Sequence, residues 1–145
     1  MPYEPVAYDP QNIFAKMLRG EIPCIKLYED EATLAFMDIM PRADGHVLAI
    51  PKSPARNLLD VDAATLAAMA PAITRLSRAI VAATGADGLT MQQFSEAAGG
   101  QVVFHLHVHL LPRWNGVSLR PHTGTMANKE DLEAMAAKIR AALAG

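Results

Sequence analysis

Three histidines alternate with apolar residues in one short segment, and this pattern constrains the fold more than any other feature of the sequence. From residue 104 the chain reads Phe-His-Leu-His-Val-His-Leu-Leu. Side chains on a strand alternate between its two faces, so His105, His107 and His109 would share one face, about 6.5 to 7 Å apart. The apolar residues between them would pack behind that face. The segment therefore predicts a strand over residues 102–111 with three imidazoles in register.

The three imidazoles indicate a site of chemistry, because each has two ring nitrogens that need partners and a charge that titrates near neutral pH. Two kinds of site fit the pattern. In one, alternating histidines bind Zn²⁺, with a further ligand from His46 or from the remaining histidine of the three. In the other, one imidazole attacks phosphorus while its neighbours donate hydrogen bonds to the phosphate oxygens, without a metal.

The surrounding sequence favours the metal-free site. No other cysteine, aspartate or glutamate lies close in the sequence to complete a zinc site, and the single cysteine, Cys24, is isolated. Residues 97–101 read Ala-Ala-Gly-Gly-Gln, and exposed glycine amides beside a strand form an anion-binding concavity. A plain glycine turn is the alternative for that loop.

Length and composition limit the class of protein. A chain of 145 residues is long enough to bury one core but not two, so we expect a single domain over residues 1–145. A hydrophobic fraction of 51% excludes a disordered chain, and a net charge of −2 provides no basic field for nucleic acid. No apolar run approaches the roughly 18 to 20 residues of a membrane span. The single cysteine fits a reducing compartment, so we expect a cytoplasmic protein with no nucleic acid or membrane partner.

Helix and strand signals extend along the whole chain. Asp9 as N-cap and Pro10 at the first helical position predict a short helix that ends at Gly20. The clearest helical periodicity runs over residues 62–84, where Pro71 predicts a kink or a break. The remaining predicted elements are a helix from about Asn128 and strands over residues 24–29, 33–37, 46–50 and 89–94.

The segment from His105 to Leu111 resembles the full signature of the histidine triad (HIT) family. Residues 12–23 resemble the amino-terminal helix and turn of the Hint branch of that family, and residues 35–41 and 45–52 resemble two of its core strands. The resemblance covers about residues 9–114, and the tail and helix over residues 115–145 lie outside it. It implies an α+β fold with an antiparallel sheet of about five strands, an N-terminal helix, a long central helix and a C-terminal helix. It also implies a homodimer whose two sheets join.

The activity implied by the resemblance is hydrolysis or transfer at the α-phosphorus of nucleoside 5′-phosphoramidates or similar AMP conjugates. In the family the middle histidine is the nucleophile, which corresponds to His107 and forms a nucleotidyl-histidine intermediate. His109 would contact the phosphate, and His105 would belong to a hydrogen-bonded relay that also includes His46. Asp38 would accept hydrogen bonds from the ribose hydroxyls. The positions that would enclose the purine base are Ile13, Phe14, Met17, Phe36 and Ile39.

Read without the family, these positions have ordinary alternatives. Phe14 and Phe36 would by default be core residues. Asp38 in an apolar strand end needs a partner, and either a ribose diol or a backbone turn would provide one. His46 beside Gly45 could equally be a buried histidine with its hydrogen bonds satisfied.

The sequence departs from the family pattern around the glycine loop. Phe94 or Ser95 stands where many relatives have an asparagine, and Val102 follows Gln101 where a hydroxyl residue is common. Ser95, Gly100, Gln101 and Val102 are therefore expected on the leaving-group side, with the leaving group itself unassigned. The amino-terminal helix has no Cys-x-x-Cys pair, so we expect neither the zinc site of some bacterial relatives nor any other metal or cofactor.

Two alternatives to a phosphoramidate hydrolase remain. One is a dinucleoside polyphosphate hydrolase of the same superfamily, which would share the nucleophile and differ in the leaving group. The other is a regulatory module that binds purine nucleotides with slow or vestigial turnover.

Overall fold

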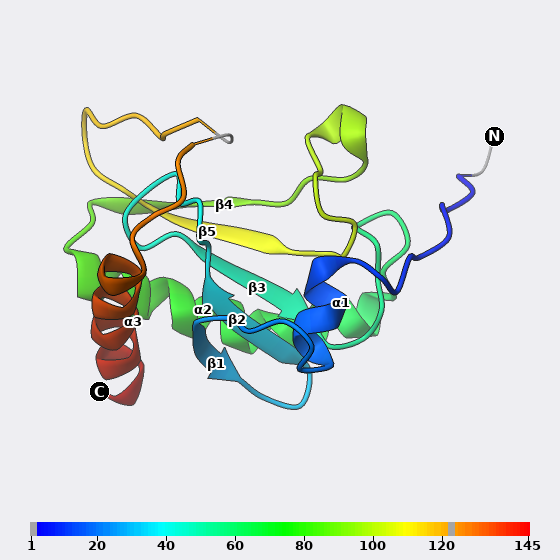
Figure 1. Ribbon diagram of the computed structural model, residues 1–145, viewed down its shortest axis with the longest axis horizontal. Helices are drawn as coiled ribbons and strands as arrows, with labels where there is room; N and C mark the ends of the chain where they lie inside the picture. The colour runs from blue at the N-terminus through cyan, green and yellow to red at the C-terminus, as the bar shows by residue number, and fades with distance from the viewer. Residues whose placement is uncertain (1–2, 122–123) are drawn as a thin grey trace.

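A five-stranded antiparallel sheet in the order β1-β2-β3-β5-β4 organises the protein (Figure 1). The computed structural model describes residues 3–121 and 124–145, so His122, to which the sequence assigns no role, lies outside the described residues. The α+β class and the antiparallel five-stranded sheet expected from the sequence are confirmed. The elements are α1 (Ile13–Leu18), β1 (Lys26–Glu29), β2 (Thr33–Met37), β3 (Val47–Pro51), α2 (Ala63–Thr84), β4 (Gly88–Gln92), the 3₁₀ turn η1 (Ala97–Gly99), β5 (Val108–Arg113) and α3 (Lys129–Ala144).

One face of the sheet packs against α2 and α3 to form the larger core (Figure 1). Alternate strand residues such as Ala49 and Leu110 point to this face, where they meet Leu76 of α2 and Ile139 of α3. Each large apolar side chain buried there contributes about 1.5–3 kcal/mol of transfer free energy. The apolar stripe of α2 therefore faces the sheet, and that of α3 packs mainly against α2 and β1.

The opposite face of the sheet carries a smaller core and leaves the rest of that face for a pocket. Phe36 of β2 and Leu48 of β3 belong to this second cluster, which α1 covers with Phe14. The β-ladder aligns Phe36 with Leu48, Leu48 with His109, and His109 with Gln92, so these four residues form one row across the sheet. Since paired residues share a face, His109 lies on the face that bears the smaller core.

Helix α2 is continuous through Pro71, so of the kink or break that the sequence predicts, the break is wrong. Pro71 has no N–H, so the carbonyl of Ala67 lacks the helical hydrogen bond that it would otherwise accept. Both residues are exposed, and water can therefore donate to that carbonyl. The helix ends at Gly85, whose φ of 68° is the left-handed conformation that glycine adopts easily. Although α2 has the length and composition of a membrane-spanning helix, its apolar stripe packs on the sheet in the manner of a core helix.

Helix α1 begins later than the sequence predicts. Its N-cap is Asn12, whose Oδ1 accepts a hydrogen bond from the Ala15 amide at 2.9 Å. Asp9 instead accepts a bond from the amide of Gln11 in the preceding turn. Both residues are good caps, and Asn12 is the one that precedes the first helical residue.

Strand β5 is the most consequential correction, because it begins at Val108 and not at residue 102. Its ladder with β3 ends at the pair Ala49 and Val108. In that register the next two pairs would be Ile50 with His107 and then Leu106 with Pro51, which has no N–H to donate. The Leu106 amide bonds to the carbonyl of Ala55 instead, at 2.8 Å. His105 and His107 therefore precede the strand, and only His109 lies within it.

Candidate active site

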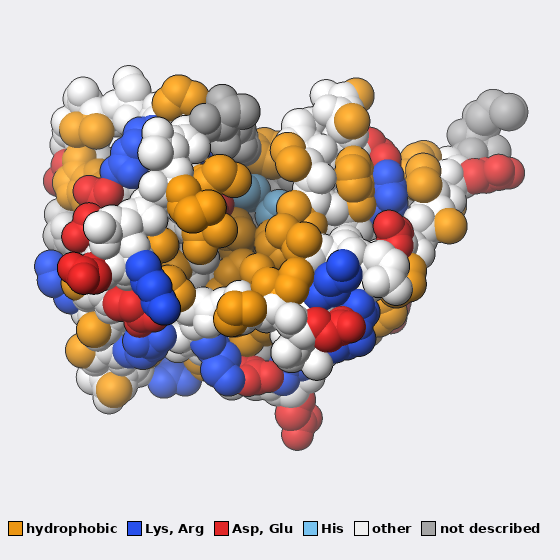
Figure 2. All heavy atoms as spheres, in the orientation of Figure 1, with side chains coloured by type: hydrophobic (Ala, Val, Ile, Leu, Met, Phe, Trp, Pro, Cys, Tyr) orange, Lys and Arg blue, Asp and Glu red, His pale blue; other side chains and the backbone are white. Residues whose placement is uncertain are grey.

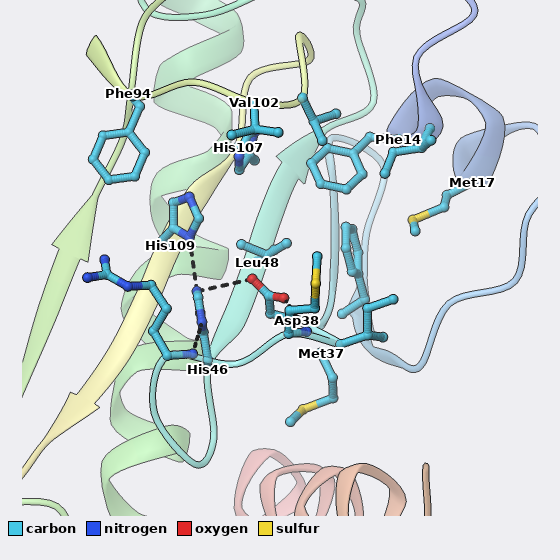
Figure 3. Close-up of a pocket in the computed structure, with 17 residues that line it drawn as sticks. Phe14, Met17, Met37, Asp38, His46, Leu48, Phe94, Val102, His107 and His109 are labelled. Atoms are coloured by element: carbon cyan, nitrogen blue, oxygen red, sulfur yellow. Dashed lines mark hydrogen bonds and ion pairs between the residues drawn. The ribbon is translucent and has the colours of Figure 1, made fainter. Parts of the chain in front are cut away.

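A pocket opens on the sheet face opposite α2, with histidines at its floor. Figure 2 shows histidine side chains at the bottom of a hollow ringed by hydrophobic side chains. Figure 3 shows Phe14 and Met17 on one side of this pocket, and His109 and Phe94 on the other. The lining residues are Ile13, Phe14, Met17, Phe36, Met37, Asp38, Ile39, Met40, Arg42, His46, Leu48, Phe94, Gly100, Val102, Val103, His107 and His109.

His107 has a defined tautomer. Its Nδ1 lies 2.7 Å from the carbonyl oxygen of His105, which can only accept, so Nδ1 carries the hydrogen and Nε2 keeps a lone pair. Burial lowers the pKa of His107, which keeps the ring neutral near pH 7. The Phe14 ring meets it edge-on, with ring centroids 5.0 Å apart. His107 is thus a neutral imidazole with a basic nitrogen in an apolar wall.

His109 takes its tautomer from His46. The Arg42 backbone amide donates to Nδ1 of His46 at 3.1 Å, so this nitrogen carries no hydrogen and the ring hydrogen is on Nε2. That Nε2 lies 2.9 Å from Nδ1 of His109, which must accept. The ring hydrogen of His109 is therefore on Nε2. This makes His109 a hydrogen-bond donor in the pocket, beside His107 at a ring distance of 4.9 Å.

His105 lies behind the pocket and does not line it. Its side chain is fully buried, with Nε2 2.9 Å from the Pro51 carbonyl and Nδ1 2.6 Å from the Tyr8 hydroxyl. Burial lowers the pKa of His105 to about 4. The predicted relay of His105 with His46 is not the arrangement found, because His46 bonds to His109. The prediction of three rings on one strand face fails because β5 begins at Val108, after His105 and His107.

Asp38 stands at the edge of the pocket with a partly satisfied carboxylate. Its Oδ1 accepts a hydrogen bond from the Met40 amide at 2.8 Å, and Oδ2 lies 3.5 Å from Nε2 of His46. Burial raises the pKa of Asp38. The backbone turn and the pocket edge are both present, so Asp38 has an oxygen available for a ligand as well as a structural bond.

The structure brings most of the residues predicted for the nucleotide into one pocket and excludes two. Ile13, Phe14, Met17, Phe36, Ile39, Asp38, Gly100 and Val102 all line it. Ser95 does not, and its hydroxyl bonds to Gln93. Gln101 is buried away from the pocket, where its amide joins Asn57 and the backbone of Glu96. Phe94, the neighbour of Ser95, lines the pocket instead, and its ring centroid lies 5.2 Å from that of His109.

The glycine loop is not the anion cradle that its sequence suggests. The Gly99 and Gly100 amides donate to the carbonyls of Glu96 and Ala97 inside the turn, at 2.9 and 3.0 Å. The Glu96 carboxylate holds the loop through Arg56 at 2.7 and 2.9 Å. Gly100 has a φ of 98°, which explains the glycine there without an anion.

Sequence reasoning missed several wall residues, of which Arg42 is the most informative. Among the described residues, Arg42 is the only lysine or arginine in the lining. Its side chain donates to the Arg120 carbonyl at 2.8 Å and lies 3.4 Å from the Gln92 amide oxygen. No sequence signal identified it, because it lies in a loop between two strands. The other missed residues are Met37, Met40, Leu48 and Val103.

Asp38, His46 and His109 also form a group with the ligand types of a metal site. One donor atom from each lies within 4.8 Å of the others. In this arrangement the two histidine nitrogens share a hydrogen, and a cation would have to displace it. The two histidine donors are thus engaged with each other.

Comparisons with known proteins agree with this geometry. Adenylylsulfatase HINT3 of Arabidopsis thaliana is 42% identical over 117 residues, which cover 77% of this chain and 59% of that protein. Adenosine 5′-monophosphoramidase hnt1 of Schizosaccharomyces pombe is 35% identical over 103 residues, covering 71% of this chain and 74% of that protein. The crystal structure of a Hit-like protein from Bartonella henselae superposes with a TM-score of 0.88 at 50% identity, over 94% of this chain and 99% of that one.

The family assignment rests on sequence and structure together. The sequence model of the HIT domain matches residues 19–116, and this range contains all three histidines of the motif and His46. The same residues form the sheet and the floor of the pocket. The chain therefore belongs to the histidine triad (HIT) family.

Proposed function

We propose that this protein hydrolyses nucleoside 5′-phosphoramidates or related AMP conjugates at the α-phosphorus, with His107 as the nucleophile. The observation that carries the proposal is the tautomer of His107, whose Nδ1–H is held by the His105 carbonyl while Nε2 keeps its lone pair. A neutral imidazole of this kind attacks phosphorus without first losing a proton.

The reaction has two steps at one phosphorus. In the first, Nε2 of His107 forms a bond to phosphorus and the P–N bond to the leaving amine breaks. The amine leaves with the electron pair of that bond and takes up a proton. In the second, water attacks the same phosphorus, the histidine–phosphorus bond breaks, and AMP and a proton leave. His109 donates its Nε2–H to a phosphate oxygen as charge develops, which is most effective in a dry site. Both imidazoles are less than a tenth exposed.

The rest of the pocket accommodates the nucleoside. Phe14 and Met17 form an apolar wall for a purine, on the side of His107 away from His109 (Figure 3). The ring of Phe36 packs edge-on against that of Phe14 and extends this wall. Asp38 accepts from the ribose hydroxyls with the oxygen that the Met40 amide does not use. The base, ribose and phosphate thus follow the pocket from α1 toward β5.

A second substrate class, conjugates with an anionic leaving group, is favoured by Arg42. Its guanidinium lies beside Gln92, which pairs with His109 in the ladder, so a cation stands beyond the phosphate position. Adenylyl sulfate is the probe that the name of the Arabidopsis relative suggests. We expect Arg42→Gln to lower kcat/KM for adenylyl sulfate more than for adenosine phosphoramidate, and equal losses would remove this class.

Trapping the intermediate tests the central proposal. Enzyme mixed with radiolabelled adenosine 5′-phosphoramidate, quenched within one turnover and digested, should yield a peptide that carries AMP on His107. The variant His107→Ala should trap nothing. Label on another residue, or rapid turnover with no trapped label under any quench condition, would count against His107.

A homodimer is proposed as the working form of the enzyme. Strand β4 lies at the edge of the sheet, and the Met91 side chain on it is 61% exposed, so a second copy could extend the sheet there. We expect sedimentation equilibrium to give twice the chain mass and Met91→Lys to shift the protein toward monomer. A monomeric wild-type protein at micromolar concentration would rule the dimer out.

A further inference from the structure

The amino-terminal segment reaches the histidine motif through Tyr8, a residue outside the range that the family model matches. The Tyr8 hydroxyl lies 2.6 Å from Nδ1 of His105, although 97 residues separate the two in the chain. The rings meet edge-on, with centroids 5.6 Å apart and planes at 70°. One hydrogen bond and one ring contact therefore join residues that the sequence gives no reason to pair.

The direction of this hydrogen bond follows from the other nitrogen of His105. Nε2 lies 2.9 Å from the Pro51 carbonyl, which can only accept, so the ring hydrogen is on Nε2 and Nδ1 is an acceptor. Tyr8 must then be the donor. Burial raises the pKa of Tyr8, so its hydroxyl keeps its hydrogen at neutral pH, and burial keeps His105 neutral.

His105 connects this bond to the nucleophile. Its ring is held at both nitrogens, and its backbone carbonyl accepts the Nδ1–H of His107 at 2.7 Å. The orientation of the His105 peptide thus decides where the lone pair of His107 points. We propose that Tyr8 is a positioning residue: its hydroxyl locks the ring of His105, and through the His105 carbonyl it sets the tautomer and direction of the His107 imidazole.

The physical consequence of losing the hydroxyl is specific. In Tyr8→Phe the ring contact remains, but a fully buried His105 nitrogen loses its donor, which is a costly state. The His105 ring can relieve it by turning over or by moving its hydrogen to Nδ1. Either change disturbs the bond to Pro51 and the peptide that holds His107.

The test compares Tyr8→Phe with Tyr3→Phe, which makes the same change in the same segment at a side chain that is 48% exposed. Because the inference rests on the proposed hydrolase function, two readouts are needed. The first is imidazole ¹⁵N NMR, which reports the tautomer and hydrogen bonding of His105 and His107 whether or not the protein turns over. The second is the single-turnover rate of histidine nucleotidylation, measured beside the Kd for AMP.

We expect Tyr8→Phe to shift the ¹⁵N signals of both histidines and to slow nucleotidylation about tenfold, the size typical for one buried hydrogen bond. The Kd for AMP should change less than twofold, and thermal melting should show a folded protein. Tyr3→Phe should match the wild type in every measurement.

Unchanged ¹⁵N signals and an unchanged rate in Tyr8→Phe would overturn the inference. So would equal losses in rate and in AMP affinity, which indicate a structural role alone. If the wild type shows no nucleotidylation while Tyr8→Phe still shifts both histidine signals, the Tyr8 connection stands and the proposed hydrolase function fails.

Discussion

His105 and His109 belong to one motif, four residues apart, yet the fold holds them by different means. His109 lies in β5, where backbone pairing with Leu48 on one side and Gln92 on the other sets its direction. His105 lies before β5 and is held through its ring by Tyr8 and Pro51. The ladder therefore aims a ring into the pocket, whereas bonds from distant segments hold a ring behind it. His107, between the two, depends on both regions.

The largest expected effect is at His107, where the two regions meet. His107→Ala removes the atom that bonds to phosphorus, so kcat for adenosine phosphoramidate should fall on the order of 10⁴-fold or more. The Kd for AMP should change far less, because the nucleophile acts chiefly in the transition state. Steady-state kinetics and calorimetry measure the two quantities. Near-normal turnover would show that the nucleophile is elsewhere.

The ladder side is tested at His109. His109→Ala removes a donor to the developing phosphate charge, and loss of one such donor lowers kcat about 10²- to 10³-fold. Ser95→Ala is the matched control, since Ser95 does not line the pocket and its removal should leave kcat unchanged. If Ser95→Ala costs as much as His109→Ala, the pocket wall has been misassigned.

The region behind the ladder is tested by the pH dependence of stability. The pKa of His105 is about 4 in the folded protein and about 6.5 when unfolded, so above pH 6.5 it is neutral in both states. As pH falls from 6.5 to 4, His105 binds a proton mainly in the unfolded chain. This should lower the free energy of unfolding by up to about 3 kcal/mol.

Urea unfolding between pH 7.5 and 4 measures this loss. His105→Gln has no charge to gain, and its stability should fall less steeply over the same range. His107 contributes in the same direction in both proteins, because burial lowers its pKa as well. Parallel curves for wild type and variant would mean that His105 titrates normally.

A smaller effect is expected at Asp38, on the nucleoside side of the pocket. Asp38→Ala should weaken AMP binding by about 1.5–3 kcal/mol, the value of a hydrogen bond to a charged group. Binding of 2′,3′-dideoxy-AMP should weaken less, because it has no ribose diol. Calorimetry with both ligands makes the comparison, and equal losses would assign Asp38 to the turn with Met40 alone.

No effect is expected from chelation. The facing nitrogens of His46 and His109 are engaged with each other, and the proposed steps use protein groups only. Turnover should survive exhaustive dialysis against EDTA, followed by elemental analysis. If EDTA removes a stoichiometric metal together with the activity, and zinc restores that activity, the protein is a metal enzyme.

Much of the fold and of the candidate site follows from local sequence. Periodicity located α2 and α3, because burial on one helix face repeats every 3.6 residues, and turn signals with apolar composition located the core strands. The family motif led to Phe14, Asp38 and Gly100, which the structure places in the pocket wall. These features depend on residues near one another in the chain or on one signature.

The tertiary structure decided the rest, where partners come from distant segments. The chain before β5 bonds through the Leu106 amide to the distant Ala55 carbonyl, and the tautomer of His109 depends on a backbone amide at Arg42. The place of Phe94 in the wall and the Tyr8 bond to His105 are likewise contacts across the fold. Alternation of residue types shows which side chains can share a face. It carries no record of which distant donor meets each ring nitrogen, and that meeting is set only when the chain packs.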